Sequence, residues 1–290
     1  MIKDVYFQKG FPDPVFENDY VLKLVRPFVP RAKEVKGVDE TGGEARTYAI
    51  DHDVILKVQR PQQLRLSTSL AREVFFLKHL EKHSDVSVPR VLGYGKEGTV
   101  EYTVMTRIPG IAYKYATLTS KQREVMFYEL GKTLYKIHNI DKTPFYESGL
   151  YPDIDIPGDM KARMKSRFDR VLAWLLRNEK ITQANVERAS AQAMPILKRV
   201  PDAEQLTPLH SNPGPEHVFV HADGTFSGVI DFGDSYISHP IYDFRSTSVR
   251  DRDLLLKGYT DKSELSENFK QLWNISYELD HITDALRKGY

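Results

Sequence analysis

A short segment in the C-terminal half of this 290-residue chain gathers residue types that could do chemistry. One residue separates His210 from Asn212, His217 follows, and Asp231 opens the sequence Asp-Phe-Gly-Asp. Imidazole nitrogens and carboxylate oxygens both bind divalent cations. Each residue taken alone is typical of a turn cap or a buried hydrogen-bond partner. Taken together, they predict a site for a metal ion or for polar catalysis.

The stretch between His217 and Asp231 has the pattern of a β-hairpin. Two short apolar runs, 217–220 and 226–231, flank Asp223-Gly224, and Asp-Gly is a frequent hairpin turn. A two-residue turn would place His217 and Asp231 on opposite faces of the strands. A three-residue loop, 223–225, would instead pair them directly and collect apolar side chains on the other face. We favour this loop, which predicts an imidazole beside a carboxylate at the open end.

The elements that must position this site begin in the first third of the chain. Lys57 lies in a β-type run, Val54–Gln59, in which residues 54, 56 and 58 share the opposite face. Glu73 lies in a stretch with helical spacing, Leu70–His83, and shares a face with leucines. A solvated lysine and a surface glutamate would explain both residues alone. Considered together with the predicted hairpin, however, the two patterns favour an ion pair between Lys57 and Glu73.

The remaining periodicity predicts an α+β fold with two lobes. Further strands are predicted at Arg46–Ile50, Val88–Tyr94 and Glu101–Thr106, which gives a small antiparallel sheet carrying one helix. Pro109-Gly110 breaks this pattern, so we divide the chain into an N-terminal lobe, 1–107, and a larger helical lobe, 108–290. Apart from the hairpin, helices are predicted in the second lobe from the Thr119/Gln122 capping box to about His138, and over Asp159–Asn178, Thr182–Arg199 and Ser263–Leu286.

Composition excludes several classes of protein. Lys and Arg number 41 against 40 Asp and Glu, so the net charge of +1 does not predict a nucleic-acid binder. The absence of cysteine excludes disulfides, thiolate catalysis and cysteine-ligated zinc. No apolar run approaches the roughly 20 residues that cross a bilayer, and the charged N-terminus lacks the apolar centre of a signal peptide. We expect a cytoplasmic protein without a membrane or nucleic-acid partner.

The segment from Leu209 to Phe244 resembles the aminoglycoside phosphotransferase family, which has the protein-kinase-like fold. That family's signature is His-Gly-Asp-x-x-x-x-Asn, a hairpin, Ile-Asp-Phe/Trp-Gly-Asp and a Pro-x-x-Asp-hydrophobic stretch. This chain has LHSNPGPEHVFV and then GVIDFGDSYISHPIYDF. The match is specific here, looser over the N-terminal lobe and only architectural over the middle helices. The resemblance implies Mg²⁺-dependent transfer of the γ-phosphate of ATP or GTP to a hydroxyl of a small molecule.

The resemblance also assigns roles within the segment. Asp231 matches the metal-binding aspartate, and His217 stands where the family usually has asparagine as the second metal ligand. His210 opens the catalytic motif, and Asn212 stands where the family has the aspartate that accepts or orients the substrate hydroxyl. An amide can accept a hydrogen bond but cannot take a proton, and a missing general base costs roughly 10²- to 10⁴-fold. The alternative is therefore a degenerate kinase-like protein that binds nucleotide or a small ligand without turnover.

The N-terminal lobe would hold the nucleotide. In kinase-like folds a strand lysine binds phosphates and pairs with a helix glutamate, the roles implied for Lys57 and Glu73. Gly42 and Gly43 could let backbone amides approach phosphates, or could form an ordinary hairpin turn. The backbone from Met105 to Ile108 is the candidate hinge that meets the purine.

Two further expectations concern carboxylates in the C-terminal lobe. Asp243, in His-Pro-Ile-Tyr-Asp-Phe, is expected to be a structural hydrogen-bond acceptor that stabilises the site loops. A series of acidic residues near the C-terminus could recognise a polycationic acceptor, as in the family, or form a solvated helix face. These are Glu264, Glu267, Glu278, Asp280 and Asp284.

A metal-dependent hydrolase is a third hypothesis for the function. It would use His210, His217 and Asp231, which are all potential metal ligands. It leaves Lys57 and Glu73 without a role, and for this reason we favour the phosphotransferase.

Overall fold

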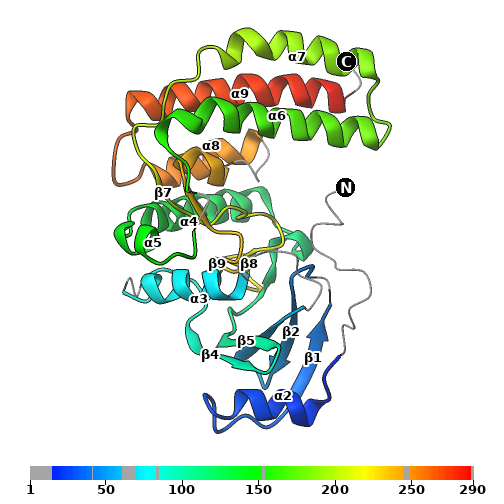
Figure 1. Ribbon diagram of the computed structural model, residues 1–290, viewed down its shortest axis with the longest axis vertical. Helices are drawn as coiled ribbons and strands as arrows, with labels where there is room; N and C mark the ends of the chain where they lie inside the picture. The colour runs from blue at the N-terminus through cyan, green and yellow to red at the C-terminus, as the bar shows by residue number, and fades with distance from the viewer. Residues whose placement is uncertain are drawn as a thin grey trace.

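The computed structural model describes residues 15–40, 42–60, 69–82, 85–151, 154–244 and 249–288, without the side chains of 249 and 250. It has a small N-terminal part built on a β-sheet and a larger, mainly helical C-terminal part (Figure 1). The predicted two-lobed α+β fold is confirmed. The exact division of the chain at residue 107 stays a prediction.

The N-terminal lobe is a five-stranded antiparallel sheet with strand order β1-β2-β3-β5-β4. Its strands are β1 (Val35–Asp39), β2 (Ala45–Ile50), β3 (Val54–Gln59), β4 (Val91–Glu97) and β5 (Val100–Thr106), and its helices are α2 (Asn18–Val25) and α3 (Ser69–Leu80). Burial alternates strictly along β3, as predicted: residues 54, 56 and 58 are buried in a core with α2. The opposite face of β3 carries Lys57, which therefore points away from that core.

The predicted elements of this lobe differ from the observed ones mainly at their ends. The predicted strand Val88–Tyr94 lies at Val91–Glu97 instead, because Pro89 lacks the N–H that a paired strand needs. The predicted helix Leu70–His83 ends at Leu80, and residue 83 lies outside the described residues. Helix α2 and strand β1 were not predicted.

The C-terminal lobe contains helices and several very short strands. The helices are α4 (Ser120–His138), α5 (Thr143–Glu147), α6 (Met160–Arg177), α7 (Gln183–Leu197), α8 (Val249–Tyr259) and α9 (Glu267–Arg287), with 3₁₀ turns η1 (Tyr113–Tyr115), η2 (Pro157–Asp159) and η3 (Pro240–Phe244). The strands are β6 (Ile111–Ala112), β7 (Thr207–Leu209), β8 (Val218–Val220), β9 (Phe226–Val229) and β10 (Tyr236–Ser238). The predicted capping box is confirmed, because Thr119 and Gln122 exchange hydrogen bonds at the start of α4. Helices α5 and α8 were not predicted.

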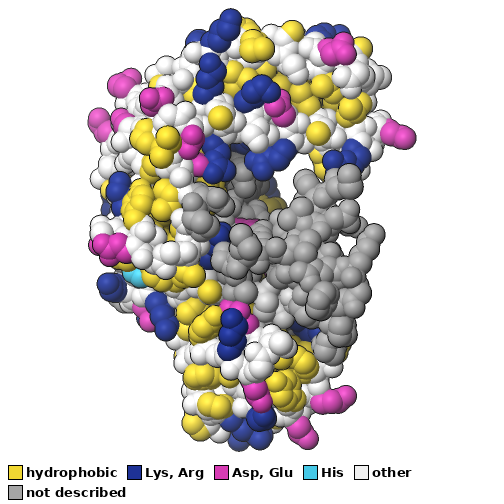
Figure 2. Space-filling view, viewed as in Figure 1, with side chains coloured by type: hydrophobic (Ala, Val, Ile, Leu, Met, Phe, Trp, Pro, Cys, Tyr) yellow, Lys and Arg dark blue, Asp and Glu magenta, His cyan; other side chains and the backbone are white. Residues whose placement is uncertain are grey.

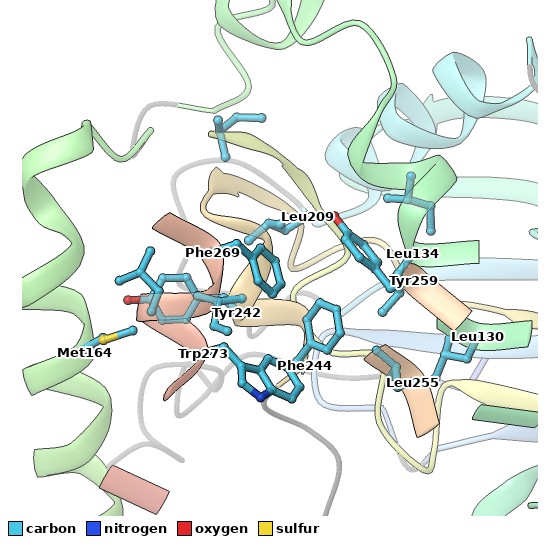
Figure 3. Close-up of a cluster of buried hydrophobic side chains, with 14 of the residues drawn as sticks. Leu130, Leu134, Met164, Leu209, Tyr242, Phe244, Leu255, Tyr259, Phe269 and Trp273 are labelled. Carbon is cyan, nitrogen blue, oxygen red and sulfur yellow. The ribbon is translucent and has the colours of Figure 1, made fainter. Parts of the chain in front are cut away.

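A cluster of aromatic side chains packs around Phe244, at the end of the site segment (Figure 3). The ring of Phe244, at the end of η3, lies 5.1 Å from Tyr259 of α8 and 5.2 Å from Trp273 of α9, centroid to centroid. Phe269 of α9 lies 5.8 Å from the same ring. Edge-to-face ring contacts of this kind add to the free energy of burial. The cluster therefore fixes η3, which follows the site loops in the chain.

Helices α4 and α8 pack so closely that glycine is required at their contact. A Cβ atom at Gly258 would lie 1.9 Å from the carbonyl oxygen of Tyr128, and one at Gly131 would lie 2.0 Å from that of Leu255. We expect Gly258→Ala to lower the free energy of unfolding by about 3 kcal/mol, since the backbones must separate. Urea unfolding measures this loss. Gly158→Ala is the control, because its Cβ would meet only an Asp202 oxygen at 3.9 Å; equal losses in the two variants would contradict the prediction.

Candidate active site

The turn of the β8–β9 hairpin has three residues, as predicted, but begins one residue earlier. The N–H of His221 donates to the carbonyl oxygen of Thr225 at 2.9 Å, which encloses residues 222–224. Gly224 occupies the left-handed region at φ 81°, which glycine adopts without strain. The predicted loop, 223–225, is therefore wrong by one position.

The pairing at the open end of the hairpin also differs from the prediction. The register shifts within the hairpin so that Ser227 is an extra residue, a β-bulge. Its hydroxyl donates a 2.6 Å hydrogen bond to the carbonyl oxygen of Pro109. Beyond the bulge, Ile230 N–H donates to the carbonyl oxygen of His217 at 2.9 Å. The predicted pairing of His217 with Asp231 is wrong, since His217 lies opposite Ile230.

Asp231 nevertheless lies beside His217, because its backbone leaves the strand. Strand β9 ends at Val229, and Asp231 has a left-handed φ of 71°. Non-glycine residues rarely adopt this region, and such strain is concentrated at functional sites. The turn brings Asp231 Oδ2 to 3.3 Å from His217 Nε2. The prediction that the imidazole and the carboxylate lie side by side is confirmed, although for a different reason.

The orientation of His217 places two lone-pair-bearing atoms opposite each other. Its Nδ1 lies 2.8 Å from the carbonyl oxygen of Asn212, which can only accept, so Nδ1 carries the proton. In the neutral ring, Nε2 then presents a lone pair to the Asp231 carboxylate. A divalent cation held between these two atoms would make the contact favourable. The same bond places Asn212 next to His217, as predicted.

Lys57 connects three separate parts of the molecule. Its Nζ lies 2.8 Å from Glu73 Oε2 on α3 and 2.9 Å from Asp231 Oδ1 after β9. Glu73 also accepts a 3.3 Å hydrogen bond from the backbone N–H of Phe232. The predicted ion pair of Lys57 with Glu73 is confirmed. The contact of Lys57 with Asp231 was not predicted, and it ties the sheet directly to the site segment.

The charges of this triad reinforce one another. Burial opposes the charge on Lys57, but the carboxylates of Asp231 and Glu73 outweigh burial and raise the pKa of its ammonium group. Burial raises the pKa of Glu73, whose side chain is only 1% exposed. Burial also acts against the charge of Asp231, yet Lys57 lowers the pKa of this carboxyl group. Asp231 is 43% exposed, which weakens both effects, so it is an ionised oxygen donor at neutral pH.

The triad lines a cavity of about 710 Å³ between the sheet and the hairpin. Besides the triad, the cavity wall includes all the other residues that the sequence proposed for nucleotide and metal binding: Gly42, Gly43, Met105, Ile108 and His217. A Cβ atom at Gly42 would lie 2.7 Å from the Ala45 carbonyl oxygen, whereas one at Gly43 would meet nothing within 4 Å. Gly42 is therefore required by the turn, and Gly43 leaves the backbone open to the cavity. His210 and Asn212 do not line this cavity.

Two backbone N–H groups of the candidate hinge already donate hydrogen bonds. Thr106 N–H donates to Arg90 at 2.9 Å, and Arg107 N–H donates to Asp53 at 2.8 Å. Within the described part of the chain, Ile108 N–H donates no hydrogen bond. A ligand in the cavity can therefore bond to Ile108 without breaking the sheet.

Asp243 holds the loop that contains His210, as expected from the sequence. Its buried carboxylate accepts hydrogen bonds from the N–H groups of His210 at 2.8 Å and Ser211 at 2.6 Å, and contacts His138 Nε2 at 2.8 Å. The His138 Nδ1 atom lies 2.9 Å from the hydroxyl of Tyr259. The structural role of Asp243 is confirmed. The contributions of His138 and Tyr259 were missed, because no local pattern connects residues more than 100 positions apart.

The imidazole of His210 is fully occupied by structural hydrogen bonds. Its Nε2 donates to the carbonyl oxygen of Ile230 at 2.9 Å, and its Nδ1 accepts from Asn212 N–H at 3.2 Å. Burial lowers the pKa of this histidine, so the ring is neutral. The adjacent Ser211 has a left-handed φ of 82° at the position where the family signature has glycine. These contacts indicate that His210 positions the loop; its predicted catalytic role stays a prediction.

Another buried histidine, His239, makes stability depend on pH. Its Nδ1 accepts a 3.2 Å hydrogen bond from Ile241 N–H, and burial together with His138 lowers its pKa to about 3. As the pH falls, the unfolded chain therefore takes up a proton at His239 before the folded chain does. The stability that the neutral ring provides is present above about pH 6.5 and is lost as the pH falls toward 3. We expect His239→Asn to keep a hydrogen-bond acceptor at this position but to have no group that titrates. Between pH 7.5 and 5.0 its free energy of unfolding should therefore fall by about 2 kcal/mol less than that of the parent. Urea unfolding at both pH values tests this, and an unchanged loss in the variant would refute it.

The acidic residues near the C-terminus are mostly paired with basic side chains. Glu267 bonds Lys270 at 2.7 Å, Asp284 bonds Arg287 at 2.8 Å, Glu278 pairs with Arg199, and Asp280 pairs with both Arg167 and Arg252. Pairing of this kind leaves little uncompensated negative charge on α9. The predicted role in acceptor recognition stays a prediction.

The chain is similar in sequence to a known protein family over the part that builds the site. A sequence model of the phosphotransferase enzyme family matches residues 38–267, which spans the sheet, the cavity and the hairpin. The chain belongs to this family. No curated protein sequence matches it.

Several solved structures share the fold of this phosphotransferase family member. The streptomycin–ATP ternary complex of APH(2″)-IIa is 19% identical, covers 93% of this chain and 91% of that chain, and has a TM-score of 0.61. The GDP and kanamycin complex of APH(2″)-IIIa is 15% identical, with coverage of 93% and 92% and a TM-score of 0.67. The macrolide 2′-phosphotransferase MphH from Brachybacterium faecium is 19% identical, with 94% coverage of both chains and a TM-score of 0.62. At these identities the likeness shows the fold alone.

None of the described helices is both long and apolar enough to cross a membrane. The described residues also contain no group of three or more acidic or histidine side chains that could hold a metal ion by themselves. Any cation at Asp231 and His217 would therefore need further ligands, such as water or a bound molecule.

Proposed function

We propose that this phosphotransferase family member binds a purine nucleoside triphosphate with a divalent cation and transfers the γ-phosphate to a hydroxyl group of a small molecule. The observation that carries the proposal is the contact of Lys57 with both Glu73 and Asp231 on the wall of the cavity. Neighbouring structures hold ATP or GDP, which supports a nucleotide as the ligand.

The donor atoms at the hairpin fit a cation that arrives with phosphates. Asp231 and His217 are two ligands from the protein, and Mg²⁺ commonly uses one or two carboxylates together with substrate phosphates. When bound, the cation would neutralise negative charge on the phosphates. Imidazole at the second position also suits softer metals such as Mn²⁺, so both ions belong in the tests.

The residues of the chain would contribute positioning and positive charge, which account for most of the catalysis of phosphoryl transfer. Lys57 would bind the phosphates, and Glu73 would keep its ammonium group in place. Ile108 N–H would bond the purine edge, and the open backbone at Gly43 would approach the phosphates. Asn212 would accept a hydrogen bond from the acceptor hydroxyl and orient it, without taking its proton.

A second candidate function is nucleotide binding without turnover. Two observations favour it: Asn212 replaces the aspartate of the family signature, and Ser211 replaces its glycine while keeping a left-handed backbone. Both changes lie in the loop that would receive the acceptor. The cavity and the Lys57 triad are unaffected by them.

Thermal unfolding with ATP, GTP and ADP, each with and without Mg²⁺ or Mn²⁺, tests the nucleotide site directly. Ligand binding stabilises a protein by mass action, so binding is detected even without turnover. We expect stabilisation by a triphosphate only when a divalent cation is present. A phosphate-transfer screen over hydroxylated acceptors then separates the two candidates. The absence of any nucleotide-dependent shift would reject both.

A further inference from the structure

Helix α3, which carries Glu73, lies between the sheet and the helical lobe and buries apolar side chains in the core of that lobe (Figure 1). Its residues Phe76, Leu77 and Leu80 belong to the hydrophobic cluster of the helical lobe. The ring of Phe76 lies 5.0 Å from that of Phe232 in the site segment, centroid to centroid. Hydrophobic side chains also gather on the surface where α3 meets this lobe (Figure 2). The core between the sheet and α2 is a separate cluster, so the C-terminal lobe sets the position of Glu73.

Tyr151, in the loop after α5, contacts α3 just before and just after its buried glutamate. The side chain of Tyr151 is only 5% exposed. The guanidinium group of Arg72 lies 5.7 Å from the Tyr151 ring centroid, and Arg72 Nε donates a 2.9 Å hydrogen bond to the carbonyl oxygen of Leu150. The rings of Phe75 and Phe145 lie 6.0 Å and 5.3 Å from the Tyr151 ring. Residues 150 and 151 therefore fix the first turns of α3.

The hydroxyl group of Tyr151 joins α3 to the site segment. Its oxygen lies 3.1 Å from Ser235 Oγ and 3.5 Å from the carbonyl oxygen of Arg72. Because that carbonyl oxygen can only accept, Tyr151 donates to it and accepts from the Ser235 hydroxyl. The N–H of Ser235 donates to the carbonyl oxygen of Phe232 at 3.1 Å, and the N–H of Phe232 donates to Glu73. These bonds form a closed ring, since Arg72 and Glu73 are neighbours in the chain.

The ring determines whether Lys57 can meet both of its carboxylates. Lys57 Nζ contacts Glu73 at 2.8 Å and Asp231 at 2.9 Å, one on each side of the ring. Lengthening either contact by about 1 Å would take it beyond hydrogen-bond distance. Tyr151 and Ser235 are not among the described residues of the cavity wall. Any effect of their hydroxyl groups on a ligand in the cavity must therefore pass through the carboxylates.

We propose that Tyr151 is a positioning residue for phosphate binding. Its hydroxyl group holds α3 and the site segment in one unit, so that Glu73 and Asp231 meet Lys57 together. The inference rests on the proposed function, because it takes the ligand to be a nucleoside triphosphate. The purine edge would bond to Ile108, which lies outside this unit. Loss of the hydroxyl group should therefore weaken the binding of phosphates and leave the binding of the purine unchanged.

The first experiment compares the parent protein with Tyr151→Phe, which removes only the hydroxyl group. Calorimetry measures the Kd of the Mg²⁺ complexes of ATP and GTP, and the Kd of adenosine and guanosine. We expect triphosphate binding to weaken about fivefold, as for one lost buried hydrogen bond, and nucleoside binding to change by less than about twofold. Tyr146→Phe is the matched control, because it removes the hydroxyl group of an exposed tyrosine on α5.

A second variant tests the other hydroxyl group of the ring. Ser235→Ala should weaken triphosphate binding as much as Tyr151→Phe does. If the two hydroxyl groups act together, the double variant should bind no more weakly than either single variant, because the ring is already open. Ser235→Ala also carries the comparison should Tyr151→Phe fail to fold.

Hydrogen exchange in the nucleotide-free protein gives a readout that does not depend on the proposed function. The backbone amides of α3 should exchange at least about threefold faster in Tyr151→Phe than in the parent, while those of α2 keep their rates. A parent protein that binds no nucleotide would reject the proposed function. The exchange rates would still decide whether Tyr151 holds α3 in place.

Each outcome decides the proposal. Faster exchange confined to α3, together with weaker binding confined to the triphosphates, supports it. Unchanged exchange of α3 in Tyr151→Phe overturns it, as do equal losses for nucleoside and triphosphate. A similar loss in Tyr146→Phe, or additive losses in the double variant, would also overturn it.

Discussion

Lys57→Ala is expected to abolish stabilisation by nucleotide and divalent cation. Lys57 Nζ is the shared partner of Glu73 and Asp231, at 2.8 and 2.9 Å, and lies on the wall of the cavity. Without it, two carboxylates face the phosphates with no compensating charge. In the parent, a ligand at 100 times its Kd adds about 2.7 kcal/mol to the free energy of unfolding, which raises Tm by several degrees. Thermal unfolding with and without the Mg²⁺ complexes of ATP and GTP measures the difference.

The control for this variant is Lys78→Ala, which removes an exposed lysine from the same helix as Glu73. It should keep the full nucleotide-dependent shift. Lys57→Met, which preserves most of the side-chain volume, provides a second variant in case alanine prevents folding. A shift in either Lys57 variant equal to that of the parent would show that the lysine does not hold phosphates.

Asn212→Asp is expected to raise phosphate transfer by roughly 10²-fold or more. The backbone of residue 212 is held on both sides, since its N–H donates to His210 and its carbonyl oxygen accepts from His217. Amide and carboxylate have nearly the same shape, so the substitution changes chemistry more than position. The new carboxylate can take the proton of the acceptor hydroxyl. Initial rates with a saturating triphosphate and a fixed acceptor measure the gain in kcat.

Two variants separate this effect from a change in binding. Asn212→Ala should transfer no faster than the parent, while the nucleotide-dependent shift stays the same in all three proteins. Asn212→Asp combined with Lys57→Ala should lose the gain. Parent activity at ordinary kinase rates, roughly 1 to 100 per second, would show that Asn212 does not impair catalysis. Nucleotide binding without transfer in either form would favour the binding protein.

The residue types of the site, and the elements that carry most of them, could be predicted from the amino-acid sequence alone. The alternation along Val54–Gln59 placed Lys57 opposite the buried face, and the helical spacing around Glu73 turned it inward. The Thr119/Gln122 box marked the start of α4. These features are local, because each depends on side chains within a few residues of one another. Together with the predicted hairpin, the first two features led to the ion pair, whereas the likeness to a phosphotransferase came from the motifs over Leu209–Phe244.

The way in which the site is assembled could not be predicted, because it depends on contacts between distant segments. The contact of Asp231 with His217 does not come from the predicted register but from a bulge at Ser227 and a left-handed turn. A bulge adds a single residue, and the bond from Ser227 to Pro109 that accompanies it joins positions 118 residues apart. Likewise, Asp280 pairs with two arginines from different helices, Arg167 and Arg252, which the sequence did not predict. Register and charge pairing depend on packing between distant segments, and periodicity along the chain carries no information about it.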